Sequence, residues 1–336
     1  MFSEDVLTPA ESGEFIANNA QHIKIDEKGI EKLCEEMLLS IKSKLEIPDT
    51  GANINYPGKE DPKAVDWIFV ADALNFCFWS YANTEKWTVD GHSGYYALEA
   101  ALARALREGY DITNPHFYHK ISEELLHTIL KGDNSATIPL FKKRVSVLHE
   151  VGSILIEKYD GTFATCLKEA NKSAVKLLEI VVNNFPCFRD EAIYKNRRVS
   201  LYKRAQILVS DIWNFFNGTG LGGFEDIDKI TMFADYRIPQ VLVYFKVLNY
   251  DHALMKKLKD EELLESGSEE EVEIRGCSIH AIELLKKKIE QKLVSSQQNV
   301  EMPNSSLIDY YLWCYRRKYA DEMEHIPFHK TLGIYY

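Results

Sequence analysis

Apolar residues recur at helical spacing along most of this chain, and no other feature constrains its fold as strongly. In residues 30–45 they occupy positions i, i+3, i+4 and i+7, the pattern of an amphipathic helix. Similar stripes occupy residues 98–106, 140–151, 167–182, 201–212, 241–248, 279–293 and 307–319. Thr8-Pro9-Ala10-Glu11 has the spacing of a capping box, so another helix should begin at Pro9. These stripes predict roughly ten or more helices and a mainly all-α fold.

Few segments are compatible with β-strands, and none alternates with helices as a βαβ unit would. The candidates are short: Ile68–Val70, Phe76–Phe78, Lys86–Val89 and Val272–Ile274. Gly218–Gly223 spells GxGxxG, but it follows a helical stripe instead of a strand, so we interpret it as a loop and not as a dinucleotide site. We therefore expect no parallel sheet.

The 336 residues contain no internal repeat, so we expect one domain over residues 1–336, with room for two helical lobes. Two segments are predicted to be surface loops. Residues 260–273 carry eight acidic residues around a Ser-Gly-Ser sequence, and residues 295–306 are polar with a proline before the last helix.

Charge and hydropathy exclude several classes of partner. The chain has 40 Lys and Arg against 51 Asp and Glu, a net charge of −11, which disfavours binding to long nucleic acid. No segment approaches the roughly 20 apolar residues of a membrane span. The first basic residue is Lys24, so no secretory signal is predicted, and six scattered cysteines without a CxxC motif are typical of reduced, buried thiols. We expect a cytoplasmic protein.

Histidine spacing gives no support for a metal site. His116 and His119 are three residues apart and His325 and His329 are four apart, but neither pair forms an HExxH motif. Zinc needs three or four converging ligands, and no such set is apparent. We expect no metal and no cofactor.

Asp235 is an acid placed among aromatic residues just before a predicted helix. It lies two residues after Phe233 and two before Arg237, and Pro239 should begin the helix. Asp235 could therefore cap that helix or pair with Arg237. Alternatively, it could be a positioned carboxylate facing a cleft, with Phe233 as a stacking platform.

Asp309 lies in an aromatic helical stripe, where an unpaired carboxylate would be costly to bury. It could form a salt bridge with Arg316 or Lys318 on the helix surface. Its oxygens could instead accept hydrogen bonds from the N–H groups of a guanine-like base. Tyr310 and Cys314 are four residues apart and should share one face of this helix.

A basic stretch follows Glu191 and contains no acid before Asp211. Its five cations are Lys195, Arg197, Arg198, Lys203 and Arg204. They could form a solvated face or a clamp for a single phosphate group, for which Arg and Lys are suited. The aromatic run Trp67–Trp79, which includes Asp72 and Asn75, is interpreted as core.

Several blocks, in order along nearly the whole chain, resemble the queuosine salvage family, the queuosine 5′-phosphate N-glycosylases. The blocks are Phe185–Asp190, Tyr202–Leu208, Met232–Arg237, Val272–Cys277, Asp309–Trp313 and Ile334–Tyr336. The resemblance implies an all-α fold akin to helical DNA glycosylases. It also implies hydrolysis of queuosine 5′-monophosphate to queuine and ribose 5-phosphate without a metal, queuine then being available for insertion into tRNA.

The resemblance also implies roles for individual residues. Asp235 would be the catalytic carboxylate, Phe233 would stack on the deazaguanine, and Asp309 with Tyr310 would hold the base. Such a carboxylate suits the chemistry, because cleavage of an N-glycosidic bond passes through an oxocarbenium-like state. Whether it acts as a nucleophile or an electrostatic stabiliser is left open by the sequence.

Two positions depart from the family pattern. Asn53 aligns with a base-contacting His, and Cys314 stands where the family has an Asp, so the base contacts there would differ. Lys203 and Arg204 are the predicted phosphate contacts. The expected partner is a small-molecule substrate, and the alternative function is a non-catalytic helical protein that binds a modified base or another protein.

Overall fold

The structure is a computed structural model that describes residues 5–42, 57–81, 83–296 and 302–336. These residues form fifteen α-helices and only short strands, which confirms the mainly all-α prediction. The chain divides into two units. The first contains Met1–Thr50, Asp190–Lys203 and Asp228–Leu332, and the second contains Gly51–Arg189, Arg204–Ile227 and Gly333–Tyr336.

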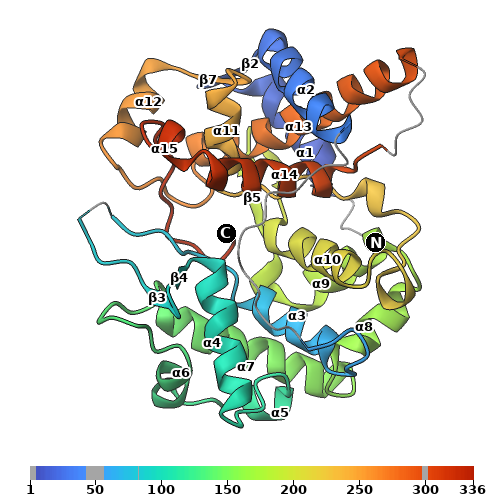
Figure 1. Ribbon diagram of the computed structural model, residues 1–336, viewed down its shortest axis with the longest axis vertical. Coiled ribbons are helices and arrows are strands. Elements are labelled where there is room, and N and C mark those ends of the chain that lie inside the picture. The colour runs from blue at the N-terminus through green and yellow to red at the C-terminus, as the bar shows by residue number, and fades with distance from the viewer. Residues whose placement is uncertain (1–4, 43–56, 82, 297–301) are drawn as a thin grey trace. The chain divides into compact units, whose positions relative to one another are not determined.

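The longest helix of the first unit is α13 (Glu269–Ser295), and four other helices of that unit pack against it (Figure 1). Those in contact with it are α1 (Pro9–Asn19), α2 (Glu27–Lys42), α11 (Ile238–Tyr244) and α14 (Ser305–Lys318). Two shorter helices, α12 (His252–Lys259) and α15 (Ala320–Met323), complete the unit. Residues 271–279 of α13 are buried without interruption, so this helix runs through the core instead of lying on it.

Short strands tie the segments of the first unit together. β6 (Arg197–Ser200) pairs in parallel with β1 (Val6–Leu7) and antiparallel with β5 (Glu191–Tyr194). β2 (Ile23–Ile25) pairs antiparallel with β7 (Leu248–Tyr250).

The β5–β6 hairpin brings Asp190 close to the start of the following helix, α10 (Lys203–Phe215). Its turn residues Lys195 and Asn196 have φ angles of 45° and 62°, the left-handed values that a two-residue hairpin turn requires. Beyond the hairpin, the amide of Leu201 donates to the Asp190 carbonyl at 3.0 Å.

Two glycines allow α1 and α13 to pack at close range. A Cβ atom on Gly276 would lie 2.7 Å from Cβ and Cγ2 of Ile16, and one on Gly13 would lie 2.8 Å from Cγ2 of Ile279. Real Cβ atoms do not approach other carbons so closely, because interiors are already packed to crystal-like density. The contact between these two helices therefore depends on the absence of side chains at both positions.

We expect Gly276→Ala to destabilise the protein by about 1–3 kcal/mol, the usual cost of overpacking a core. The sign of the change in unfolding free energy is informative, because alanine has a higher helix propensity than glycine and would by itself stabilise α13. Thermal melts of the variant and of Gly58→Ala test this expectation. A Cβ on Gly58 meets nothing within 4 Å, so that control should melt close to wild type. Equal melting temperatures for all three proteins would contradict the packing argument.

The second unit is built around α3 (Ala64–Ala73), whose ten residues are all buried. It contacts α4 (Tyr95–Arg107), α7 (Phe141–Lys158) and α8 (Phe163–Ala170). The remaining helices are α5 (Pro115–Tyr118), α6 (Glu123–Ile129), α9 (Ala174–Asn184) and α10 after its first residue, and β3 (Thr88–Val89) pairs with β4 (His92–Ser93). Trp67 is fully buried and Trp79 is 5% exposed, which confirms that the aromatic run belongs to the core.

Three of the four predicted strands are wrong. Ile68–Val70 lies inside α3 and Val272–Ile274 lies inside α13. Both helices are buried on all sides there, so their apolar residues form runs that cannot be distinguished from a buried strand by periodicity. Phe76–Phe78 is not in a strand either, whereas Lys86–Val89 contains β3.

The boundaries of the two predicted loops also need correction. α13 already begins at Glu269, so only the first part of the acidic segment 260–273 is a loop. The acids at 269–271 occupy the first turn of α13, where the helix dipole favours negative charge. In the polar segment 295–306, α13 ends at Ser295 and α14 begins at Ser305, and residues 297–301 lie outside the described residues.

Other local predictions are confirmed. Thr8 and Glu11 form the reciprocal hydrogen bonds of a capping box at the start of α1. Gly218–Gly223 is a loop that contains a 3₁₀ turn, η2 (Gly220–Gly222). All six cysteines are free and buried. Among the described helices, none is both long enough and apolar enough to cross a bilayer.

Candidate active site

Residues 230–237, which we call the Asp235 loop, have no regular secondary structure and lead directly into α11. Met232 and Ala234 are fully buried, and Phe233 is 8% exposed. The amide of Asp235 donates to the Phe233 carbonyl at 2.7 Å, which folds the backbone tightly between these two residues. Residues 230–234 are all buried, and this burial fixes the backbone that presents Asp235.

One oxygen of Asp235 serves the helix that follows. Oδ1 accepts hydrogen bonds from the amides of Arg237 and Ile238, each at 2.8 Å. These donors belong to Arg237, the N-cap residue of α11, and to Ile238, its first residue, so Asp235 binds the start of the helix from two residues before the N-cap and is not the N-cap itself. The other oxygen, Oδ2, accepts no hydrogen bond from the described part of the chain, and the residue remains partly exposed. One oxygen of the carboxylate is thus held by two hydrogen bonds, and the other has no hydrogen-bond partner among the described residues.

The carboxyl group of Asp235 is recessed among protein atoms. Burial raises the pKa of Asp235, and the charge of Lys203 is the strongest of the influences that lower it. The amides of Ile238 and Arg237 also lower this pKa, because they hydrogen bond to the charged form. Lys203 and the two amides favour the ionised form against the effect of burial. The ionised carboxylate can stabilise the positive charge of a transition state near Oδ2.

Asp309 comes from α14 and holds the Asp235 loop in place. Its Oδ2 accepts the amide hydrogen of Phe233 at 2.9 Å, and the residue is 6% exposed. Arg316, a salt-bridge partner considered from the sequence, donates from Nε to the Gln240 side chain at 3.0 Å. The structure therefore brings Phe233, Asp235 and Asp309 together at one place in the first unit.

Tyr310 and Cys314 share a face of α14, as their spacing predicts. The Tyr310 ring is 38% exposed and lies nearly parallel to the Trp313 ring, with 6.2 Å between ring centroids. Cys314 is 1% exposed, and burial raises the pKa of its thiol to about 11 while a hydrogen bond with Tyr310 acts in the opposite direction. The third predicted base contact, Asn53, lies outside the described residues.

The two predicted phosphate contacts have different surroundings. Lys203 is 7% exposed, its amide donates to Asp190 Oδ2 at 3.1 Å, and its charge acts on Asp235. Arg204 is 1% exposed, and its guanidinium donates to the carbonyls of Asp72, Ala73 and Cys187 within the second unit. These surroundings favour a structural role for Arg204, because its guanidinium binds backbone carbonyls at the end of α3 and at Cys187.

Sequence reasoning missed a buried ion pair next to the Asp235 loop. Arg275 of α13 forms two hydrogen bonds with the carboxylate of Asp190 and one with the carbonyl of Ala234. The detectable signal was the spacing of Glu271 and Arg275, which are four residues apart and can pair on one face of a helix. That signal was lost because residues 272–274 were interpreted as a strand.

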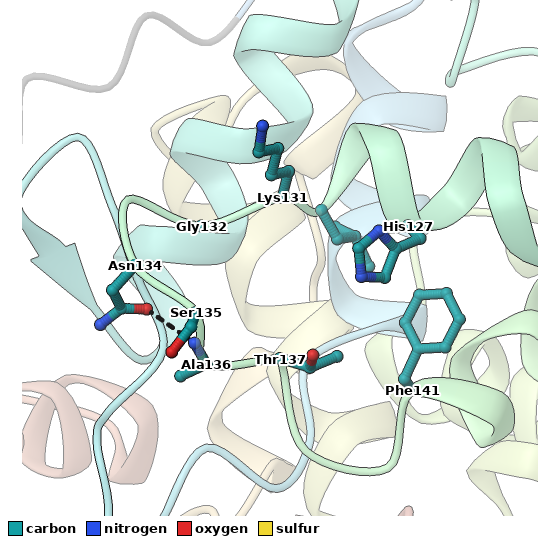
Figure 2. A pocket seen from close by; sticks show the side chains of 9 residues that line it. His127, Lys131, Gly132, Asn134, Ser135, Ala136, Thr137 and Phe141 are labelled. Atoms are coloured by element: carbon teal, nitrogen blue, oxygen red, sulfur yellow. Dashed lines mark hydrogen bonds between the residues drawn. The ribbon is translucent and has the colours of Figure 1, made fainter.

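A pocket of about 220 Å³ in the second unit offers different chemistry (Figure 2). The His127 and Phe141 rings lie edge to face on one side of it, and Lys131 is the cationic residue of its lining. The residues that line it are His127, Leu130, Lys131, Gly132, Asn134, Ser135, Ala136, Thr137 and Phe141. This lining contains no carboxylate, so the pocket lacks the group on which glycosidic-bond cleavage depends.

The histidines provide no ligand set. His329 is 1% exposed, and burial lowers its pKa to about 3, so its ring is neutral at physiological pH. Throughout the residues that the structure describes, no three His, Cys, Asp or Glu side chains are arranged to hold a metal ion. The Asp235 loop and α14 are therefore the best-supported candidate site.

Comparison with known proteins places the chain among relatives of one kind. The family described as queuosine salvage protein matches residues 55–336. A Bos taurus protein is 43% identical over 344 residues, covering 99% of this chain and 100% of the relative. A Mus musculus protein is 41% identical over 335 residues, covering 98% and 99%, and a Sphaerobacter thermophilus protein is 38% identical over 280 residues, covering 81% of each.

All three relatives are named queuosine 5′-phosphate N-glycosylase/hydrolase. The matched residues 55–336 include the Asp235 loop, the buried pair of Asp190 and Arg275, and α14 with Asp309. This chain belongs to the queuosine salvage protein family.

Proposed function

We propose that this protein is an N-glycosidase that hydrolyses queuosine 5′-phosphate to queuine and ribose 5-phosphate, with Asp235 as the catalytic carboxylate. The names of its full-length relatives support the reaction. The observation that supports the residue is the asymmetry of the Asp235 carboxylate, whose Oδ1 is fixed by two amides while Oδ2 remains open.

In this reaction the bond between C1′ of the ribose and the base nitrogen breaks, and its electron pair leaves with the base. Positive charge then develops at C1′ and the ring oxygen, and the ionised Oδ2 of Asp235 stabilises it or bonds to it. Water adds its hydroxyl to C1′ and its proton to the departing base, which gives ribose 5-phosphate and queuine. In either role Asp235 acts in its ionised form.

The neighbouring residues bind the base. Phe233 stacks on the deazaguanine, and the carboxylate of Asp309 accepts hydrogen bonds from its N–H edge, with Tyr310 beside it. Cys314, on the same face of α14 as Tyr310, is a further proposed contact, and the role of Asn53, which lies outside the described residues, stays a prediction. The support for this arrangement is the hydrogen bond from the Phe233 amide to Asp309, which ties the proposed stacking residue to the proposed base acceptor.

Incubation of the purified protein with queuosine 5′-phosphate, followed by mass spectrometry for free queuine, tests the proposal. Queuine release that scales with protein concentration supports an N-glycosidase. Tight binding of the nucleotide without release would instead support the alternative, a non-catalytic binding protein.

The pH dependence of kcat should report Asp235. Because burial raises the pKa of Asp235, activity should be lost on acidification at a higher pH than for an ordinary aspartate. The charge of Lys203 lowers this pKa, so Lys203→Met should move the acid limb to still higher pH. Lys195→Met removes the same charge from a surface pair with Glu269 and should leave the limb in place. Identical profiles for both variants would contradict the assignment.

Lys203 is also the proposed contact for the 5′-phosphate. Lys203→Met should therefore lower kcat/KM for queuosine 5′-phosphate more than for queuosine, and reduce the ratio between them by roughly 10-fold or more, the scale of a hydrogen bond to a charged group. The ratio cancels the effect of Lys203 on Asp235, which acts on both substrates. A ratio unchanged from wild type would assign the phosphate to other residues.

The reaction is proposed to take place in the cytoplasm, without long nucleic acid or membrane as a partner. Six free, buried cysteines fit a reducing compartment. The net charge of −11 fits a small-molecule substrate better than a polyanion.

A further inference from the structure

The guanidinium of Arg275 is the centre of a buried polar network in the first unit. Nε donates to the Ala234 carbonyl at 2.8 Å, and Nη1 and Nη2 donate to the two oxygens of Asp190 at 2.9 and 2.5 Å. Nη1 also donates to Glu271 at 3.1 Å. Arg275 and Glu271 are 1% exposed and Asp190 is 3% exposed, so all three charges are shielded from water.

Asp190 extends this network to the start of α10. The same Oδ2 that binds Arg275 accepts the amide of Lys203, and the Asp190 carbonyl accepts that of Leu201. Tyr202, between them, has a φ of 45°, a left-handed conformation that is strained for a tyrosine. Its hydroxyl donates to Glu191 at 2.6 Å, which helps to hold this conformation. The backbone before Lys203 is therefore held in one unusual shape.

We propose that Arg275 is a positioning residue for the reaction, which holds the Asp235 loop and the Lys203 backbone in one fixed arrangement through Asp190. This inference rests on the proposed function of Asp235. Ala234 directly precedes Asp235, so the bond from Arg275 Nε sets the place from which the carboxylate projects. The bond from Asp190 sets the place from which the Lys203 side chain projects, and the charge of Lys203 acts on Asp235.

The shape of the arginine side chain is essential to this role. A guanidinium has five donors in a rigid plane and can bind a carboxylate with two of them while a third points elsewhere. Lysine keeps the charge but has one nitrogen, so it cannot hold Asp190 and Ala234 together in the same geometry. Arg275 is itself anchored in the buried part of α13, which makes it a rigid support.

The test compares Arg275→Lys with Glu273→Gln, a matched control on the same helix. Glu273 is fully buried and accepts hydrogen bonds from Gln21, His22 and Tyr194, none of which belongs to the Asp235 loop. Both variants remove interactions of a buried charge on α13. Only Arg275→Lys should lower kcat for queuosine 5′-phosphate by about 10- to 100-fold, because misplacement of a reacting group affects the chemical step, and a displaced Lys203 should also raise KM.

Hydrogen exchange gives a second measurement that does not depend on activity. In Arg275→Lys, the amides of residues 231–238 should exchange at least about tenfold faster than in wild type, because the loop is no longer held at Ala234. In Glu273→Gln this segment should exchange as in wild type. Should Arg275→Lys fail to fold, Asp190→Asn removes the charge pair while keeping one acceptor, and it should show the same two changes at smaller size.

The two proposals fail in different ways. Unchanged exchange in residues 231–238, or equal losses of kcat in the Arg275 and Glu273 variants, would overturn the positioning role while leaving the N-glycosidase intact. A wild-type protein that releases no queuine would overturn the proposed function, and a positioning role for Arg275 in that reaction would fall with it.

Discussion

Asp235→Asn should abolish queuine release, lowering kcat by at least about 100-fold, the scale of losing one group that stabilises transition-state charge. The amide is nearly the same size as the carboxylate but cannot balance positive charge at C1′. Its oxygen can still accept the amides of Arg237 and Ile238, because the Asn side chain keeps a hydrogen-bond acceptor at this place. The melting temperature should therefore stay within a few degrees of wild type. Single-turnover release of queuine and a thermal melt measure the two properties.

Asp235→Ala separates the two tasks of this side chain. Without either oxygen the variant should be as inactive as Asp235→Asn, and it should also lose about 1 kcal/mol of stability through the missing hydrogen bonds to the start of α11. Substantial turnover by Asp235→Asn would leave Asp235 only with its role at the start of α11.

Asp309→Ala should have the second largest effect. If Asp309 accepts the N–H edge of the deazaguanine, its removal costs roughly 1.5–3 kcal/mol of queuine binding, or about 10- to 100-fold in affinity. It also leaves the buried amide of Phe233 without its acceptor, so the unfolding free energy should fall by about 1–3 kcal/mol. Calorimetric titration of queuine and denaturant unfolding measure the two losses.

Asp309→Asn distinguishes these effects. Its amide oxygen can still accept the Phe233 amide, so most of the stability should return, whereas its NH₂ group faces the donors of the base and affinity should stay low. Wild-type affinity in both variants would remove Asp309 from the base site.

The helices could be predicted because most have one apolar face. α2 and α7 show the i, i+3, i+4 pattern clearly, and the capping box at Thr8 marks the start of α1. α3 and the first half of α13 could not be assigned in this way, because they are buried on every side and their periodicity disappears. The β5–β6 hairpin was missed because its strands are short and its turn residues, Lys195 and Asn196, are not an Asn-Gly type pair.

For the site, sequence patterns identified residue types but not contacts. Asp235 was identified because an acid among aromatic residues before a helix is unusual. Its position just before α11 also explains why Oδ1 accepts the first amides of that helix. Arg204 was grouped with Lys203 because the two are adjacent, although its guanidinium binds carbonyls from two other segments. Asp190 and Arg275 are 85 residues apart in the chain, and no local pattern links residues at that separation.

The two bonds that fix Oδ1 of Asp235 have a thermodynamic consequence for turnover. An exposed aspartate rotates about its χ1 and χ2 bonds, and that freedom must be lost each time the carboxylate aligns with a substrate. In this loop the rotation is already restricted by the amides of Arg237 and Ile238. The rotational entropy of Asp235 is therefore lost once, when the loop folds, and the activation entropy of each reaction cycle is correspondingly less unfavourable.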